Sequence, residues 1–166
     1  MQLGRKPEQT AYERWGGEAF FTTLVERFYQ GVSADPLLRP MYPDDLDGPK
    51  AHLAMFLMQY WGGPRDYSEQ RGHPRLRMRH APFTIGTAQS NAWLRHMTAA
   101  VQASELNPED QQELLDYLSM AARSLVNAVT CARRPVGSTW GINRGGVCPP
   151  IAFPFNIRSV RYLEKR

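Results

Sequence analysis

The segment GEAFFTTLVERFYQGV, residues 17–32, decides the fold class, because its apolar side chains recur at intervals of three and four residues. The apolar positions are Phe20, Phe21, Leu24, Val25, Phe28 and Val32. Polar residues fill most of the positions between them, so the period predicts an amphipathic helix with one face in a core. The helical run is expected to stop at Asp35-Pro36, because a residue before proline avoids helical backbone angles.

Three further segments show the same helical period. The first begins near Pro49, which suits a first helical position because its missing N–H would be unpaired there, and it stops before the breaker Gly62-Gly63-Pro64. The second spans residues 89–102, with Trp93 on its inner face, and the third follows an Asn107 cap and runs to about Val129. No stretch alternates apolar and polar residues, so we predict an all-α core, with mostly loop and one short helix in residues 65–86.

Length and composition favour one compact domain. The 166 residues are 42% hydrophobic and 22% charged, which is sufficient for a core. Charges interrupt every apolar stretch, which excludes an integral membrane segment, and residues 1–13 lack the apolar run of a secretory signal. We therefore expect a cytoplasmic protein. Cys131 and Cys148 are too few for a disulfide framework or a four-cysteine zinc site.

The net charge of +4 is not spread evenly along the chain. Residues 1–131 carry 13 Lys and Arg against 15 Asp and Glu, whereas residues 132–166 carry 7 against 1. The basicity therefore belongs to the second segment, which also contains four Pro and four Gly. We predict an N-terminal extension over residues 1–10, a helical domain over residues 11–131, and an irregular basic tail over residues 132–166.

The motifs of common enzymes are missing from the sequence, including the glycine-rich nucleotide loops, the HExxH metal motif and the GxSxG nucleophile elbow. His80 stands out among the remaining residues, because it ends a short helical stretch and Ala81-Pro82 follows it. One interpretation is an axial ligand to iron, with Nε2 on the metal and the Nδ1–H held by a carbonyl. The alternative is an ordinary core or surface histidine.

Three aromatic residues with polar tips, Tyr29, Tyr42 and Trp93, lie on or near the predicted helices. Each offers one hydrogen-bond donor on a large apolar body. If they converge, they form a dry pocket that stabilises partial negative charge on a small bound molecule. The alternative is that each belongs singly to the core, with its polar tip reaching water.

The arginine-rich stretch 71–79 is a candidate for nucleic-acid binding, but Tyr67 is its one nearby aromatic and the rest of the domain is not basic. We therefore expect no nucleic-acid partner. An anionic cofactor fits better, because Arg77 and Arg79 flank Met78 just before His80, where they can meet the two carboxylates of a haem. A solvated charged face is the alternative.

These residues resemble those of the truncated, two-over-two hemoglobins, and within them group II. The match covers about residues 11–130, and its most specific part is the block YSEQRGHPRLRMRHAPF, residues 67–83. The shorter matching motifs are Arg27-Phe28-Tyr29, Met41-Tyr42-Pro43, Phe56-Leu57 with Tyr60-Trp61-Gly62-Gly63-Pro64, and Ala92-Trp93-Leu94. The resemblance implies a truncated globin in which two antiparallel helix pairs sandwich haem b, followed by an irregular C-terminal extension.

The resemblance also implies roles for individual residues. His80 matches the proximal iron ligand, and Tyr29, Tyr42 and Trp93 match the distal hydrogen-bonding cluster, called the distal cluster below. Leu53 is expected to pack over the distal face. Further haem contacts are expected from Phe56, Leu57, Tyr67, Arg77, Met78, Arg79, Phe83 and His52. Pro49 stands where vertebrate globins place a distal histidine and has no donor to offer.

Three hypotheses for the function remain open. The first is a haem protein that binds O₂, and other diatomic ligands such as CO and NO, with high affinity and slow release, because three donors act on the ligand. The second is a redox enzyme, a nitric oxide dioxygenase or a peroxidase, which would need a separate reductase. The third is a haem-free helical interaction module. The sequence also leaves open whether the protein forms homo-oligomers.

Overall fold

The computed structural model of the chain describes residues 9–128. Within that range the only regular elements are helices, which confirms the all-α class. They are α1 (Ala11–Arg14), α2 (Gly17–Ala34), the 3-10 turn η1 (Arg39–Met41), α3 (Asp47–Tyr60), α4 (Asp66–Arg71), α5 (Leu76–His80), α6 (Thr87–Gln102) and α7 (Pro108–Ser124). No helix in the described range is long and apolar enough to cross a membrane. The domain boundaries stay predictions, and the tail 132–166 lies outside the described residues.

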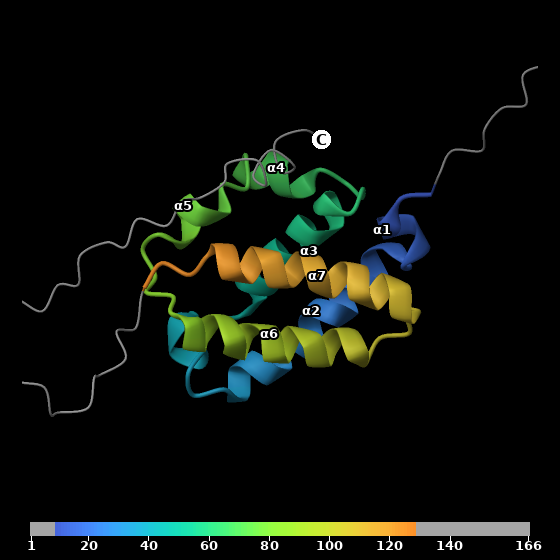
Figure 1. The fold of residues 1–166 in the computed structure, drawn as a ribbon. Coiled ribbons are helices and arrows are strands. Elements are labelled where there is room, and N and C mark those ends of the chain that lie inside the picture. Colours follow the sequence, from blue (N-terminus) through green and yellow to red (C-terminus); the bar gives the residue numbers. More distant parts are fainter. Residues whose placement is uncertain (1–8, 129–166) are drawn as a thin grey trace, which may run out of the picture. The chain divides into compact units, whose positions relative to one another are not determined.

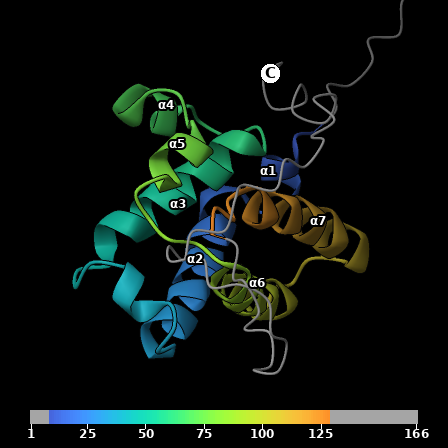
Figure 2. The ribbon, with the colours of Figure 1, turned by 60° about the vertical axis from the view of Figure 1, so that its left-hand side comes forward.

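Two pairs of antiparallel helices form the body of the described fold (Figure 1). α2 packs against α3, and α6 packs against α7, with the chain reversing direction within each pair. The pairs meet where α2 packs on α6. The short helix α4 packs on α3, and Figure 2 shows α5 next to α4. This is the two-over-two arrangement that the resemblance implied.

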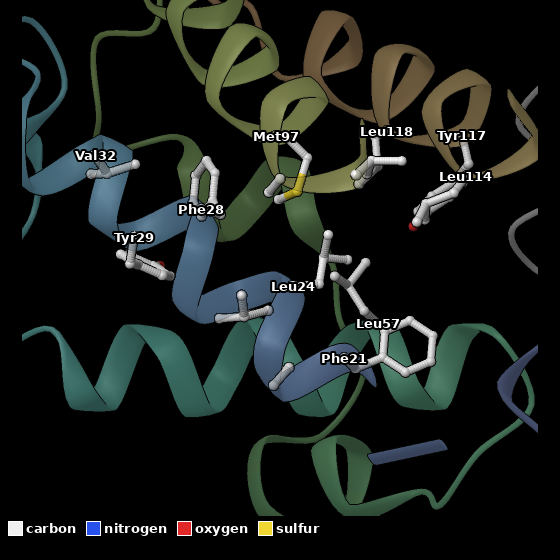
Figure 3. Packing of buried hydrophobic residues seen from close by; sticks show 14 of the residues in the cluster. Phe21, Leu24, Phe28, Tyr29, Val32, Leu57, Met97, Leu114, Tyr117 and Leu118 are labelled. Atoms are coloured by element: carbon white, nitrogen blue, oxygen red, sulfur yellow. The ribbon is translucent and has the colours of Figure 1, made fainter. Parts of the chain in front are cut away.

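The side chains of α2 form the centre of the core, as Figure 3 shows. Phe21, Leu24 and Phe28 are at most 1% exposed. The other long helices supply further fully buried side chains, which are Leu57 of α3, Met97 and Val101 of α6, and Leu114 and Leu118 of α7. Burying a side chain of this size contributes about 1.5–3 kcal/mol relative to an exposed position. The apolar face that residues 17–32 form therefore lies where the two helix pairs meet.

One helix start, one segment and one additional helix differ from the sequence-based expectation. Pro49 is the third residue of α3 and not the first, but it still lies in the first turn, where backbone N–H groups have no partner within the helix. Residues 65–86 form two short helices, α4 and α5, and not one. The helix α1 was not expected, and it begins at a capping box made by Thr10 and Glu13.

The start of α7 agrees with the prediction, and its end does not. Asn107 caps the helix as predicted, because its side-chain oxygen accepts from the N–H of Asp110 at 2.9 Å. The helix ends at Ser124 and does not reach the region of Val129. The N–H of Asn127 donates instead to the carbonyl of Ile85 at 2.9 Å. A long-range hydrogen bond thus replaces the helical one, and the apolar period of the sequence carries no sign of it.

The helices α2 and α6 approach each other closely at Gly31. The ring of His96 lies against this glycine, so a Cβ atom there would clash with ring Nδ1 and lie 2.9 Å from ring Cγ. The ring is also held on its other side, because His96 Nε2 donates a 2.6 Å hydrogen bond to Oδ2 of Asp35. The spacing of α2 and α6 at this point therefore requires a residue without a side chain.

We expect Gly31→Ala to destabilise the protein by about 1–3 kcal/mol, because the added methyl group overpacks a contact that cannot relax. The matched control is Gly48→Ala in the first turn of α3, where an added Cβ meets nothing within 4 Å. This control should be neutral or gain up to about 1 kcal/mol from reduced chain entropy. Thermal and urea denaturation of the two variants measure the difference, and equal stabilities would refute the close contact.

Candidate functional site

His80 is the last residue of α5, and its ring is held in one orientation. Nδ1 lies 2.7 Å from the carbonyl oxygen of Leu76. A carbonyl only accepts hydrogen bonds, so Nδ1 is a donor, and in the neutral ring the lone pair is then on Nε2. A neutral imidazole with this tautomer is suited to bind a metal ion through Nε2. The side chain is half-buried.

Asn127 holds the turn that follows His80. Its side-chain amide nitrogen donates to the carbonyl of Phe83 at 2.8 Å and to that of His80 at 3.4 Å. Its side-chain oxygen accepts from the N–H of Ile85 at 2.9 Å. One side chain thus fastens residues 80–85 to the end of the last described helix. Sequence reasoning missed Asn127, because the apolar period placed it inside a helix that was expected to run to about Val129.

The two arginines expected at the haem carboxylates have different surroundings. Arg79 donates from Nε to the carbonyl of Pro74 at 2.8 Å, and its Nη2 donates to the carbonyls of Arg71 and His73. Two of its three nitrogens therefore support the loop between α4 and α5. Arg77 is exposed and lines, together with Phe83 and the end of α7, a cavity of about 490 Å³. A role at the carboxylates stays a prediction for both.

His52 points to α4 and not to the distal cluster. Its Nε2 lies 2.9 Å from Nη1 of Arg71, and a guanidinium only donates, so Nε2 is the acceptor. Burial, with the charges of Arg71 and Arg79, lowers the pKa of His52. The imidazole is thus kept in its neutral form. A role of His52 at the edge of a cofactor site is compatible with this position, and it stays a prediction.

The structure brings the three members of the distal cluster together. The rings of Tyr29 and Tyr42 meet edge to face with centroids 5.6 Å apart. Phe28 connects this pair to α6, because its ring lies 5.0 Å from that of Tyr29 and 5.1 Å from that of Trp93. Trp93 is also hydrogen-bonded to Tyr42. Residues from α2, the segment after η1 and α6 therefore converge at one place.

Burial keeps both tyrosines of the distal cluster protonated. It raises the pKa of Tyr42 to about 12, although the hydrogen bond from Trp93 acts in the opposite direction. The pKa of Tyr29 is raised further above its ordinary value, first by burial and then by Tyr42. Both hydroxyl groups remain neutral donors at physiological pH. The cluster thus provides phenol O–H and indole N–H groups without a formal charge.

The apolar side chains expected at the cofactor belong to α3, α4 and the region of α5. Leu53 and Phe56 of α3 are half-buried, whereas Leu57 is completely buried in the core. Phe56 packs on Tyr67 of α4 with ring centroids 5.6 Å apart. On and after α5, Met78 is 67% exposed and Phe83 is 46% exposed. Large apolar side chains that the polypeptide leaves exposed mark a surface suited to binding.

The donor set at His80 restricts the kind of metal site that is compatible with it. Within residues 9–128, no three His, Cys, Asp or Glu side chains gather where they could hold a metal ion. A metal at Nε2 of His80 would therefore take its other ligands from a cofactor. Haem supplies four ring nitrogens and a flat apolar surface, so the single oriented imidazole and the exposed Met78 and Phe83 fit this group.

Comparison with known proteins gives an independent assignment. A model of the family described as bacterial-like globin matches residues 10–127. Group 2 truncated hemoglobin YjbI of Bacillus subtilis (strain 168) is 41% identical over 111 residues, which are 67% of this chain and 84% of the relative.

Two solved structures are similar in sequence and fold. The thermostable hemoglobin of the actinobacterium Thermobifida fusca is 56% identical with a TM-score of 0.71, and the match covers 72% of this chain and 98% of that one. The truncated oxygen-avid haemoglobin of Bacillus subtilis is 40% identical with a TM-score of 0.69, and the match covers 72% of this chain and all of the other.

The family match covers nearly all of the residues that the structure describes. Globins are haem proteins that bind small ligands. By sequence, fold and the arrangement around His80, the chain belongs to the bacterial-like globins and, within them, to the group II truncated hemoglobins.

Proposed function

We propose that this protein holds haem b through Nε2 of His80 and binds O₂, and other diatomic ligands such as CO and NO, with high affinity and slow release. The observation that carries the proposal is the hydrogen bond from Nδ1 of His80 to the carbonyl of Leu76 at 2.7 Å. It orients the ring and leaves the other nitrogen as a metal ligand. Haem, when bound, supplies the iron at which O₂ binds reversibly.

The distal cluster supports slow release of the ligand. Tyr29, Tyr42 and Trp93 offer neutral donors in a largely dry environment, and a donor aimed at a ligand with partial negative charge opposes its departure. A hydrogen bond to a charged group contributes about 1.5–3 kcal/mol, which corresponds to about ten- to a hundredfold in affinity. The related protein of Bacillus subtilis is described as oxygen-avid, which agrees with this proposal.

Several side chains would hold the cofactor. Phe56, Met78 and Phe83 offer apolar surface, and Arg77 and Arg79 offer positive charge for the two carboxylates. Leu53 would cover the distal face. Tyr67 is buried below the guanidinium of Arg79, which lies 5.9 Å from the ring centroid, so Tyr67 would support that arginine and not only the cofactor. His52 would lie at the edge of the site, whereas Leu57, which has no exposed surface, would support it from the core.

We expect His80→Gly to lose stable axial ligation, because no other described side chain offers a nitrogen with the same orientation. The absorption spectrum of the ferrous protein should change, and haem should transfer faster to an apoglobin acceptor. Added imidazole should restore the wild-type spectrum, because it replaces the missing ring. The control is His73→Ala, since His73 is exposed on the loop before α5. An unchanged ferrous spectrum in His80→Gly would refute the assignment.

We expect Trp93→Phe to release O₂ about tenfold faster, because the ring that packs on Phe28 is retained while the N–H donor is lost. Stopped-flow displacement of O₂ by CO measures this rate. Trp61→Phe is the matched control, because Trp61 packs on Trp15 with ring centroids 4.6 Å apart, within a separate aromatic group. A release rate equal to that of the wild type would remove Trp93 from the mechanism.

A further inference from the structure

We propose that Asp35 is a positioning residue for the distal cluster, because its carboxylate joins the three segments that carry Tyr29, Tyr42 and Trp93. This inference rests on the proposed function, in which these three side chains act on the ligand. Asp35 itself lies outside the cluster. It follows the last residue of α2 and is only 6% exposed.

Both oxygens of the Asp35 carboxylate have well-defined partners. Oδ1 accepts from the backbone N–H groups of Leu37 at 2.8 Å and Leu38 at 3.3 Å. Oδ2 accepts from Nε2 of His96 at 2.6 Å and from Nη2 of Arg95 at 2.7 Å. We call the carboxylate, these partners and Gly31 the Asp35 clamp. Four donors surround one buried anion, so its geometry is strongly restricted.

The partners of Asp35 belong to the segments that carry the distal cluster. Asp35 directly follows α2, which carries Tyr29. The backbone N–H groups of Leu37 and Leu38 belong to the segment that leads from α2 to η1. Directly after η1, the N–H of Tyr42 donates to the carbonyl of Arg39 at 3.2 Å. His96 lies three residues after Trp93 in α6, on the same side of that helix. One carboxylate thus fixes the three segments relative to one another.

The hydrogen bond to His96 carries more of this connection than the one to Arg95. The side chain of Arg95 is 67% exposed, so its ion pair is screened by water. The side chain of His96 is 19% exposed and rests against Gly31. Its ring therefore cannot withdraw from the carboxylate without moving α2. The His96 ring is thus held by Gly31 on one side and by the Asp35 carboxylate on the other.

Asp35 remains an acceptor throughout the physiological pH range. The hydrogen bond from His96 is the largest cause that lowers the pKa of this carboxyl to about 2, and the N–H of Leu37 is the next. The group is thus ionised whenever the protein is folded near neutral pH. Loss of the carboxylate by mutation would leave the donors around it without their common partner.

Small displacements of the clamp should affect ligand release. A hydrogen bond weakens steeply when its donor leaves the narrow range of favourable distance and angle. Trp93 and Tyr42 come from different segments, and their mutual hydrogen bond depends on the relative position of those segments. A looser connection between α2, the η1 segment and α6 would therefore misdirect donors that remain chemically intact.

The experiment compares variants of the full chain with haem bound. Asp35→Asn keeps the shape of the side chain and removes its charge. His96→Leu removes the donor, and His96→Gln restores a nitrogen donor at a similar place. The matched control is Arg27→Ala, because Nη1 of Arg27 donates at 2.6 Å to the carbonyl of Ala103 and thus joins α2 to the far end of α6. Melting temperatures record the stability of each variant.

Two measurements separate positioning from stability. We expect Asp35→Asn and His96→Leu to release O₂ about three- to tenfold faster, with a higher C–O stretching frequency in the carbon monoxide complex. The indole N–H resonance of Trp93, assigned by its loss in Trp93→Phe, should shift in the same complex. His96→Gln should recover most of the wild-type values, and Arg27→Ala should change only the melting temperature.

Unchanged release rates and C–O frequencies in His96→Leu, despite a lower melting temperature, would overturn the proposal and leave Asp35 a structural residue. If Asp35→Asn does not fold, the comparison of His96→Leu with His96→Gln decides the question alone. The outcome is distinct from a failure of the proposed function. If the proposed function fails, Trp93→Phe itself releases O₂ at the wild-type rate. If only the positioning role of Asp35 fails, Trp93→Phe releases O₂ faster than the wild type, and the Asp35 and His96 variants release it at the wild-type rate.

Discussion

The burial of α2 against α3 and α6, where the two helix pairs meet, is the interaction on which the rest of the structure depends. Leu24 and Phe28 are almost completely removed from solvent, and the ring of Phe28 contacts Trp93 of α6. The adjacent residue, Tyr29, contacts Tyr42. The helix that forms the core therefore also places Tyr29 of the proposed distal cluster, so a shift of α2 would change the stability and the arrangement of that cluster together.

A second constraint is the small size of the helix that carries His80. An isolated helix of five residues is not stable in water, because the cost of its first turn is not recovered. Hydrogen bonds between this helix and the segments around it stabilise it instead. Arg79 binds carbonyl groups of the preceding loop, and Asn127 binds those of the following turn. The orientation of His80, the proposed iron ligand, thus depends on residues distant from it in sequence.

The sequence was sufficient to predict the helical class and the four long helices, and to single out Tyr29, Tyr42 and Trp93, which the structure brings close together. Helical periods are local, and the block ending in His80 has the pattern of a known family. The Asp35 clamp and Asn127 were not found. The position of Asp35 before Pro36 predicts only the end of a helix, although its main partner is His96, 61 residues further along the chain. A contact between two residues so far apart in the sequence produces no periodic pattern of side chains.

The amino-acid sequence by itself determined which segments become helices, which side of each is apolar, and which residue types are available for ligand binding. These properties follow from local spacing and from the chemistry of single side chains. Only the tertiary structure decided that Tyr42 and Trp93 share a hydrogen bond, that Arg79 supports a loop, and that α7 ends at Ser124. The reason is physical, since each depends on a distance between segments that the packing of the two helix pairs sets.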